Sequence, residues 1–89
     1  MKGGEDMEKA IKKNVRLQQL RKTAKLSQSQ LAESAGVDVR MYQNYEQGVR
    51  DISKAQLSTL LRICNTLSCK LSDIVTDQET AELLIKYER

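Results

Sequence analysis

The sequence predicts a small all-α domain, and three observations predict it: the composition, the missing residue types and the spacing of apolar residues. The chain has 89 residues, of which 39% are hydrophobic and 30% charged, which suits one globular domain with a modest core. Proline, tryptophan and phenylalanine are absent, whereas β-rich folds contain more aromatic residues. Apolar residues recur at helical spacing along most of the chain, so we expect a bundle of short helices.

The first helix is predicted to begin near Met7 and to run to about Ala24. Its apolar residues lie close to one face, at spacings of seven, three and four residues between Ala10 and Ala24. We therefore expect residues 1–13 to form an N-terminal extension that contains the start of this helix.

The next segment predicts two short helices joined by a tight turn. Leu31 and Ala35 are four residues apart and give the first of them a narrow apolar stripe. Gly36 follows where a left-handed residue can end a helix, and Asp38 is a good N-cap for the next helix. This pattern is typical of a helix-turn-helix, whose second helix enters the major groove of DNA.

The second helix of the pair, at about 38–47, has two different faces. Tyr42 and Tyr45 are three residues apart on one side, and we expect them to pack in the core together with Val37 from the turn. Polar side chains that could reach base edges fall on the other side: Arg40, Gln43, Asn44 and Gln47.

Three further helices are predicted after Gly48, at about 54–67, 71–75 and 77–89. The first of these carries leucines and Cys64 in an i, i+3, i+4, i+7 pattern, which gives it one apolar face. The role of the apolar residues in the last helix stays open, because they could serve dimerisation or fold back on the core.

Three predicted helix starts share one signature, a Ser or Thr followed three residues later by Gln or Glu. The matches begin at Ser27, Ser53 and Thr76. In such a capping box the hydroxyl accepts a free backbone N–H and the Gln or Glu reaches back to the cap residue, and each cap stabilises by about 1 kcal/mol.

The net charge of +3 is unevenly distributed along the chain. Residues 14–75 hold nine basic and five acidic residues, hence +4, whereas residues 76–89 carry −2. The basic excess therefore lies on the segment with the helix pair, which agrees with phosphate binding but suits any slightly basic surface equally well.

Several function classes are disfavoured by missing residues. No histidine and no glycine-rich phosphate loop occurs, so we expect no enzyme. Cys64 and Cys69 lack the spacing and the partners of a zinc site, so we expect no metal and no cofactor. No long apolar run and no signal peptide is visible, so we expect a reduced, cytoplasmic protein without a membrane segment.

A series of motifs lies at characteristic spacings between residues 14 and 75: Leu17-Gln-Gln-Leu20-Arg21, Leu26-Ser27-Gln28-Ser-Gln30-Leu31-Ala32, Ala35-Gly36-Val37, Tyr45-Glu46-Gln47-Gly48, the leucine pattern of 57–67 and Leu71-Ser-Asp73-Ile74-Val75. Taken together, they resemble the phage repressor and Cro-like helix-turn-helix domains, also called the XRE family. The resemblance implies a compact five-helix repressor-like bundle over residues 14–75. Residues 76–89 lie outside the resemblance, and their apolar residues predict a C-terminal helical extension.

The resemblance also assigns roles on the recognition helix at about 38–47. Val39, Arg40 and Asn44 fall where the family reads bases, and Gln43 lies beside them as a fourth base-reading candidate. Arg40 could pair with guanine O6 and N7, Asn44 could pair with adenine or hold a phosphate, and Val39 could contact a thymine methyl group or pack against the turn.

The resemblance also implies phosphate contacts by Gln28 and Arg50, and one internal ion pair. Lys25, Gln47 and Lys54 are further phosphate candidates beside the helix pair, although scattered lysines look the same on any soluble protein. Arg21 and Glu46 match a family pair that forms a salt bridge between the first and third helices. Lys25 and Ser68 stand where the family often has a helix-ending glycine.

The resemblance implies a sequence-specific regulator that binds double-stranded DNA, in most cases a repressor, from a bacterium or a phage. Such a protein would bind as a homodimer to two half-sites about one helical turn, roughly 34 Å, apart. The alternative is a protein-interaction module such as the antitoxin of a toxin–antitoxin pair, in which the acidic segment 77–89 contacts a protein partner.

Overall fold

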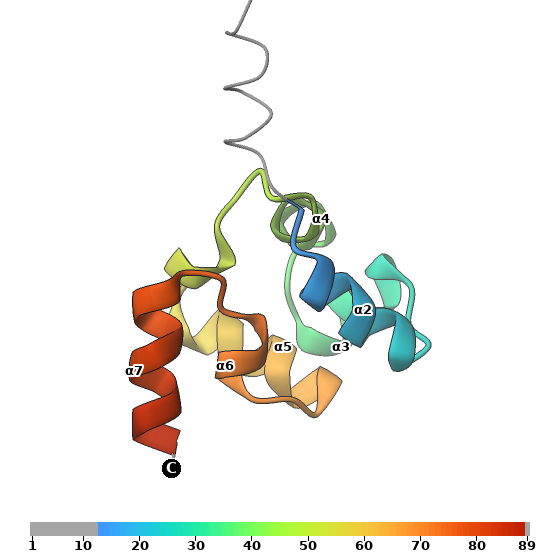
Figure 1. Cartoon of the computed structure of the whole chain (residues 1–89). Coiled ribbons are helices and arrows are strands. Elements are labelled where there is room, and N and C mark those ends of the chain that lie inside the picture. The colour runs from blue at the N-terminus through green and yellow to red at the C-terminus, as the bar shows by residue number, and fades with distance from the viewer. Residues whose placement is uncertain (1–12, 89) are drawn as a thin grey trace, which may run out of the picture.

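Six α-helices and one 3₁₀ helix make up the part of the chain that the computed structural model describes, residues 13–88 (Figure 1). In chain order they are α2 (Val15–Thr23), α3 (Gln28–Ala35), α4 (Val39–Gln47), η1 (Ile52–Lys54), α5 (Leu57–Leu67), α6 (Leu71–Ile74) and α7 (Gln78–Glu88). No strand occurs within this range, so the predicted all-α fold is confirmed. None of these helices is long and apolar enough to cross a membrane.

The core lies where six of these elements meet. Each of α2, α3, α4, η1, α5 and α6 contributes one large side chain that is almost completely buried: Leu17, Leu31, Tyr42, Ile52, Ile63 and Ile74. Full burial of such a side chain stabilises by roughly 1.5–3 kcal/mol, so the core ties every element from α2 to α6 to the others. Tyr45 is also buried and Val37 packs against the cluster, as predicted.

Two helix ends place a residue other than glycine in the left-handed backbone conformation. Lys25, after α2, has a φ of 62°, and Ser68, after α5, has a φ of 55°. These are the two positions at which the family often has glycine. A residue with a Cβ atom adopts this conformation at a cost of roughly 1–2 kcal/mol, so both helix ends store some strain.

The helix predicted to run from near Met7 to about Ala24 does not continue through Asn14. Its described part, α2, begins at Val15, and Asn14 precedes it as a nonhelical N-cap that accepts a hydrogen bond from the first turn at 3.0 Å. The Nδ2 of Asn14 also donates to the carbonyl oxygen of Ile74 (3.3 Å), and its backbone nitrogen donates to that of Glu46 (2.8 Å). These bonds tie Asn14 to α6 and α4 and fix the start of α2 at this residue. The portion of the prediction before residue 13 lies outside the described residues.

One predicted capping box is formed and one is replaced by a long-range contact. At the start of α3, the Oγ of Ser27 accepts from the backbone of Gln30 (3.0 Å), whose side chain accepts in return (2.9 Å). The box predicted at Ser53 is wrong, because its Oγ accepts from the backbone nitrogens of Thr76 (2.9 Å) and Asp77 (3.0 Å). A 3₁₀ turn occupies this place, and α5 begins later than predicted.

The box predicted at Thr76 is also wrong, because the next residue caps the helix. The Oδ2 of Asp77 accepts hydrogen bonds from the backbone nitrogen (2.9 Å) and the hydroxyl (2.7 Å) of Thr80. Asp ranks above Thr as an N-cap residue, so the carboxylate takes this role.

The last helix, α7, packs beside α6 and contributes nothing to the buried core (Figure 1). Ala81 and Leu84 are half-buried, and the hydroxyl of Ser72 on α6 donates to the carboxylate of Glu88 at 2.9 Å. The rest of its apolar surface stays exposed: Leu83, Ile85 and Tyr87.

Candidate nucleic-acid interface

The helix pair α3–α4 is held by a turn of three residues, from Gly36 to Asp38. Gly36 ends α3 with a φ of 73°, and a Cβ atom there would lie 2.9 Å from the guanidinium group of Arg62. Asp38 begins α4 by accepting a hydrogen bond from the backbone nitrogen of Met41 at 3.0 Å. Because α3 packs against both α4 and α5, the orientation of α4 is fixed by the rest of the bundle.

One face of the helix α4 is buried in the bundle, and the opposite face is accessible to solvent. Tyr42, Tyr45 and Glu46 are buried. The four base-reading candidates lie on the remaining surface of the helix: Val39 and Arg40 are exposed in its first turn, and Gln43 and Asn44 are half-buried in its second. The first turn of α4 is therefore the most accessible part of the surface that these four base-reading candidates form.

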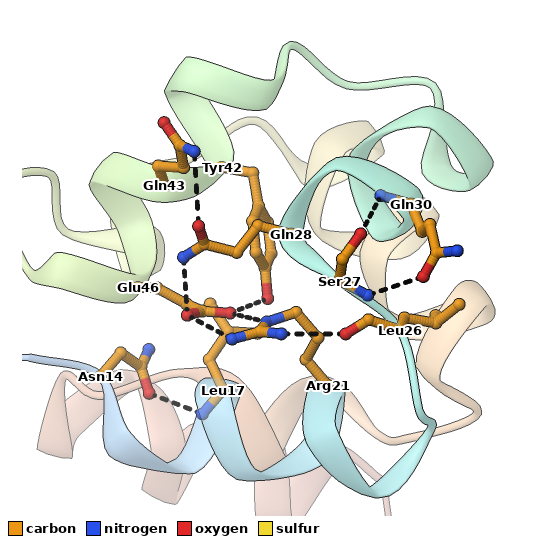
Figure 2. A network of polar contacts seen from close by, with 10 residues as sticks. All are labelled: Asn14, Leu17, Arg21, Leu26, Ser27, Gln28, Gln30, Tyr42, Gln43 and Glu46. Carbon is orange, nitrogen blue, oxygen red and sulfur yellow. Dashed lines mark hydrogen bonds and ion pairs between the residues drawn. The ribbon is translucent and has the colours of Figure 1, made fainter.

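A buried ion pair lies directly beneath this surface (Figure 2). Arg21 on α2 donates to Glu46 on α4 through its Nε and, at 3.2 Å, through its Nη2. The Nη1 of Arg21 donates to the carbonyl oxygen of Leu26 (2.9 Å), and the hydroxyl of Tyr42 donates to Glu46 (2.7 Å). The ion pair expected between Arg21 and Glu46 is therefore present and joins α2 to α4.

Gln28, a phosphate candidate, directs its side chain toward this ion pair. Its Nε2 donates to the Oε1 of Glu46 at 3.0 Å, and its Oε1 accepts from the Nε2 of Gln43 at 3.3 Å (Figure 2). A continuous chain of hydrogen bonds therefore runs from the buried carboxylate to the half-buried Gln43 on α4.

The charge of Glu46 is stabilised where it lies. Burial opposes this charge, but hydrogen bonds from Arg21, Tyr42 and Gln28 outweigh the burial and hold the pKa of Glu46 below its usual value. Burial, together with the hydrogen bond to Glu46, raises the pKa of the Tyr42 hydroxyl well above its usual range. Glu46 is therefore ionised and Tyr42 protonated at neutral pH.

The sequence comparison identifies the family. A family model described as helix-turn-helix matches residues 17–74, a span that covers most of the chain from α2 to α6. The chain belongs to the Cro/C1-like (XRE-type) helix-turn-helix family. Members of this family are DNA-binding transcription regulators. Neither a curated protein nor a solved structure matches the chain significantly.

The remaining phosphate candidates of this XRE-family domain flank the helix pair. Lys25 precedes α3, Gln47 ends α4, Arg50 lies in the following loop and Lys54 ends η1; all four side chains are exposed. They are thus accessible to a ligand, whereas Gln28 is engaged inside the domain.

Two features of the XRE domain were missed by sequence reasoning. Asn14 could have been found, because an Asn directly before an amphipathic segment fits an N-cap. The pairing of Gln28 with Gln43 has no local signal, because the two residues come from different helices and a glutamine amide can pair with almost any polar group.

Proposed function

We propose that this XRE-family protein is a sequence-specific transcription regulator, of repressor type, that reads the major groove with α4. The observation that supports this function best is the first turn of α4, where Arg40 and Val39 are exposed on a helix whose other face is anchored in the core. Such a helix can enter a major groove without rearranging the bundle.

The base-reading roles follow from the chemistry of the exposed groups. Arg40 can donate two hydrogen bonds to O6 and N7 of a guanine, and Asn44 can pair with N6 and N7 of an adenine. Val39 is 37% exposed and would contact a thymine methyl group. Lys25, Gln47, Arg50 and Lys54 would bind phosphates on either side and supply much of the affinity, so binding should weaken steeply with salt.

A homodimer would place two such helices on half-sites about 34 Å apart. Large apolar side chains are exposed on two helices outside the helix pair, and they are candidates for the contact between subunits: Leu57 and Leu61 on α5, and Leu83, Ile85 and Tyr87 on α7. Exposed apolar groups of this kind are typical of interaction surfaces.

The substitution Arg40→Ala tests the assignment of α4 as the reading helix. We expect it to weaken binding to the preferred DNA site by about 1–3 kcal/mol and to relax specificity at one base pair. Lys86→Ala, which removes a cation from α7, is the matched control and should leave the preference unchanged. An equal loss for Arg40→Ala on every DNA sequence would instead make Arg40 a phosphate contact.

A second candidate function is supported by α7 alone. This helix carries acidic side chains and exposed apolar residues, and none of its residues is buried against the bundle. A protein-interaction module, such as the antitoxin of a toxin–antitoxin pair, would use this surface for a protein partner. Deletion of α7 would then abolish partner binding while DNA binding persists.

A further inference from the structure

We infer that Gln43 determines specificity at one base pair, and that the buried Glu46 sets which atoms Gln43 presents to DNA, acting through Gln28. The inference rests on the proposed function, because it names the class of base that one residue of α4 selects. Gln43 accepts a hydrogen bond from the exocyclic amino group of adenine or cytosine, and discriminates against guanine and thymine, which present an oxygen there.

The first step is the orientation of Gln28. An ionised carboxylate can only accept hydrogen bonds, and Arg21 and Tyr42 hold Glu46 in this state. The amide atom of Gln28 that lies 3.0 Å from Glu46 must therefore be the nitrogen. Rotation of this amide by half a turn would bring two oxygens together beside a full negative charge.

The second step transfers this polarity to the surface. With its nitrogen on Glu46, Gln28 directs its oxygen at Gln43, so the atom of Gln43 at 3.3 Å must be the nitrogen. The oxygen of Gln43 consequently points away from Gln28, as Figure 2 shows. Each amide in the chain thus fixes the orientation of the next.

The third step is the consequence for base reading. A glutamine without internal partners can turn its amide over and present a donor or an acceptor with similar ease. If the amide of Gln43 turned over, it would lose the hydrogen bond to Gln28 and place its oxygen against the oxygen of Gln28. Gln43 therefore presents its oxygen, an acceptor, to DNA. Its second N–H remains available for N7, which makes adenine the base that satisfies both amide atoms. Gln28 is a positioning residue in this arrangement and needs no contact with DNA.

The test compares affinities of the full chain for its selected DNA site and for variants of that site with each base pair changed in turn. The wild type should prefer adenine or cytosine over guanine or thymine by at least about fivefold at one position. Gln43→Ala and Gln28→Ala should both reduce that preference to less than about twofold while the preferences at other positions persist. Gln19→Ala, at an exposed glutamine on α2, is the control and should keep every preference.

Three results would overturn the inference, and they are distinguishable. A uniform loss of affinity in Gln28→Ala on all sequences would mean that Gln28 serves only the fold. Gln43→Ala could instead abolish a preference of the wild type for guanine or thymine. Gln43 would then present a donor rather than its oxygen, and this result does not depend on the folding of the Gln28 variant. A wild-type protein that binds all sequences equally would refute the proposed function itself.

Discussion

At the scale of single residues, Glu46 is a carboxylate inside the bundle that donors from three helices stabilise. Removing one partner of a buried ion pair leaves the other charge without compensation, which costs about 3–5 kcal/mol. We therefore expect Arg21→Ala to lower the free energy of unfolding by about 3 kcal/mol in a urea titration. The matched control is Arg16→Ala, since Arg16 forms an exposed pair with Asp73 at 3.7 Å; it should cost less than about 1 kcal/mol.

The same carboxylate should make stability depend on acid pH. The pKa of Glu46 is lower in the folded protein than its ordinary value of 4.5, so its contribution is complete above about pH 4.5 and is lost as the pH falls through the folded pKa. Thermal unfolding should show this loss in the wild type and a shallower loss in Glu46→Gln. Glu33→Gln, at an exposed carboxylate on α3, should keep the wild-type slope; equal slopes for all three proteins would contradict the role of Glu46.

The ion pair of Arg21 with Glu46 could be expected from the sequence, because both residues stand in motifs that resemble the family. The amide chain from Gln28 to Gln43 could not be expected, since its geometry depends on how α3 and α4 approach each other. Base-reading roles are the hardest to predict, because the residue types on an exposed helix face do not reveal what they contact.

At the scale of helices, the number and order of the α-helices from residue 14 onward could be predicted from apolar spacing, but the 3₁₀ helix η1 and several helix starts could not. The capping box predicted at Ser53 does not form because the hydroxyl of Ser53 accepts a tertiary hydrogen bond from Thr76. The box predicted at Thr76 does not form because the neighbouring Asp77 caps the helix. Helix ends were better specified: Gly36 and Gly48 adopt the left-handed conformation, and so does Ser68. A glycine-preferring position can thus be recognised even where another residue occupies it.

Ser68→Gly should stabilise the protein because it relieves the left-handed strain after α5. The gain should be up to about 1 kcal/mol, since the greater freedom of glycine in the unfolded chain offsets part of the relief. The same replacement inside α5, Asn65→Gly, should destabilise by roughly 0.5–1 kcal/mol. Chemical denaturation measures both; a loss of stability in Ser68→Gly would show that its side chain matters more than its backbone.

At the scale of the whole molecule, the bundle from α2 to α6 has a continuous core to which α7 adds no buried residue. Deletion of residues 78–89 should therefore leave the helical content of the remaining bundle and its cooperative unfolding intact. If α7 forms the contact between subunits, the truncated protein should be monomeric by light scattering and should bind a two-half-site DNA more weakly. Unfolding of the truncated chain would instead assign α7 to the structural core.

The central claim is that α4 reads a specific DNA sequence, and a selection from random duplexes at physiological salt tests it most directly. The affinity for the enriched sequence is then compared with that for random DNA. We predict an enriched palindrome with half-sites one helical turn apart, bound at least ~10³-fold more tightly than random DNA. The absence of any enriched sequence, with only weak and salt-sensitive binding, would contradict the claim and favour the protein-interaction module.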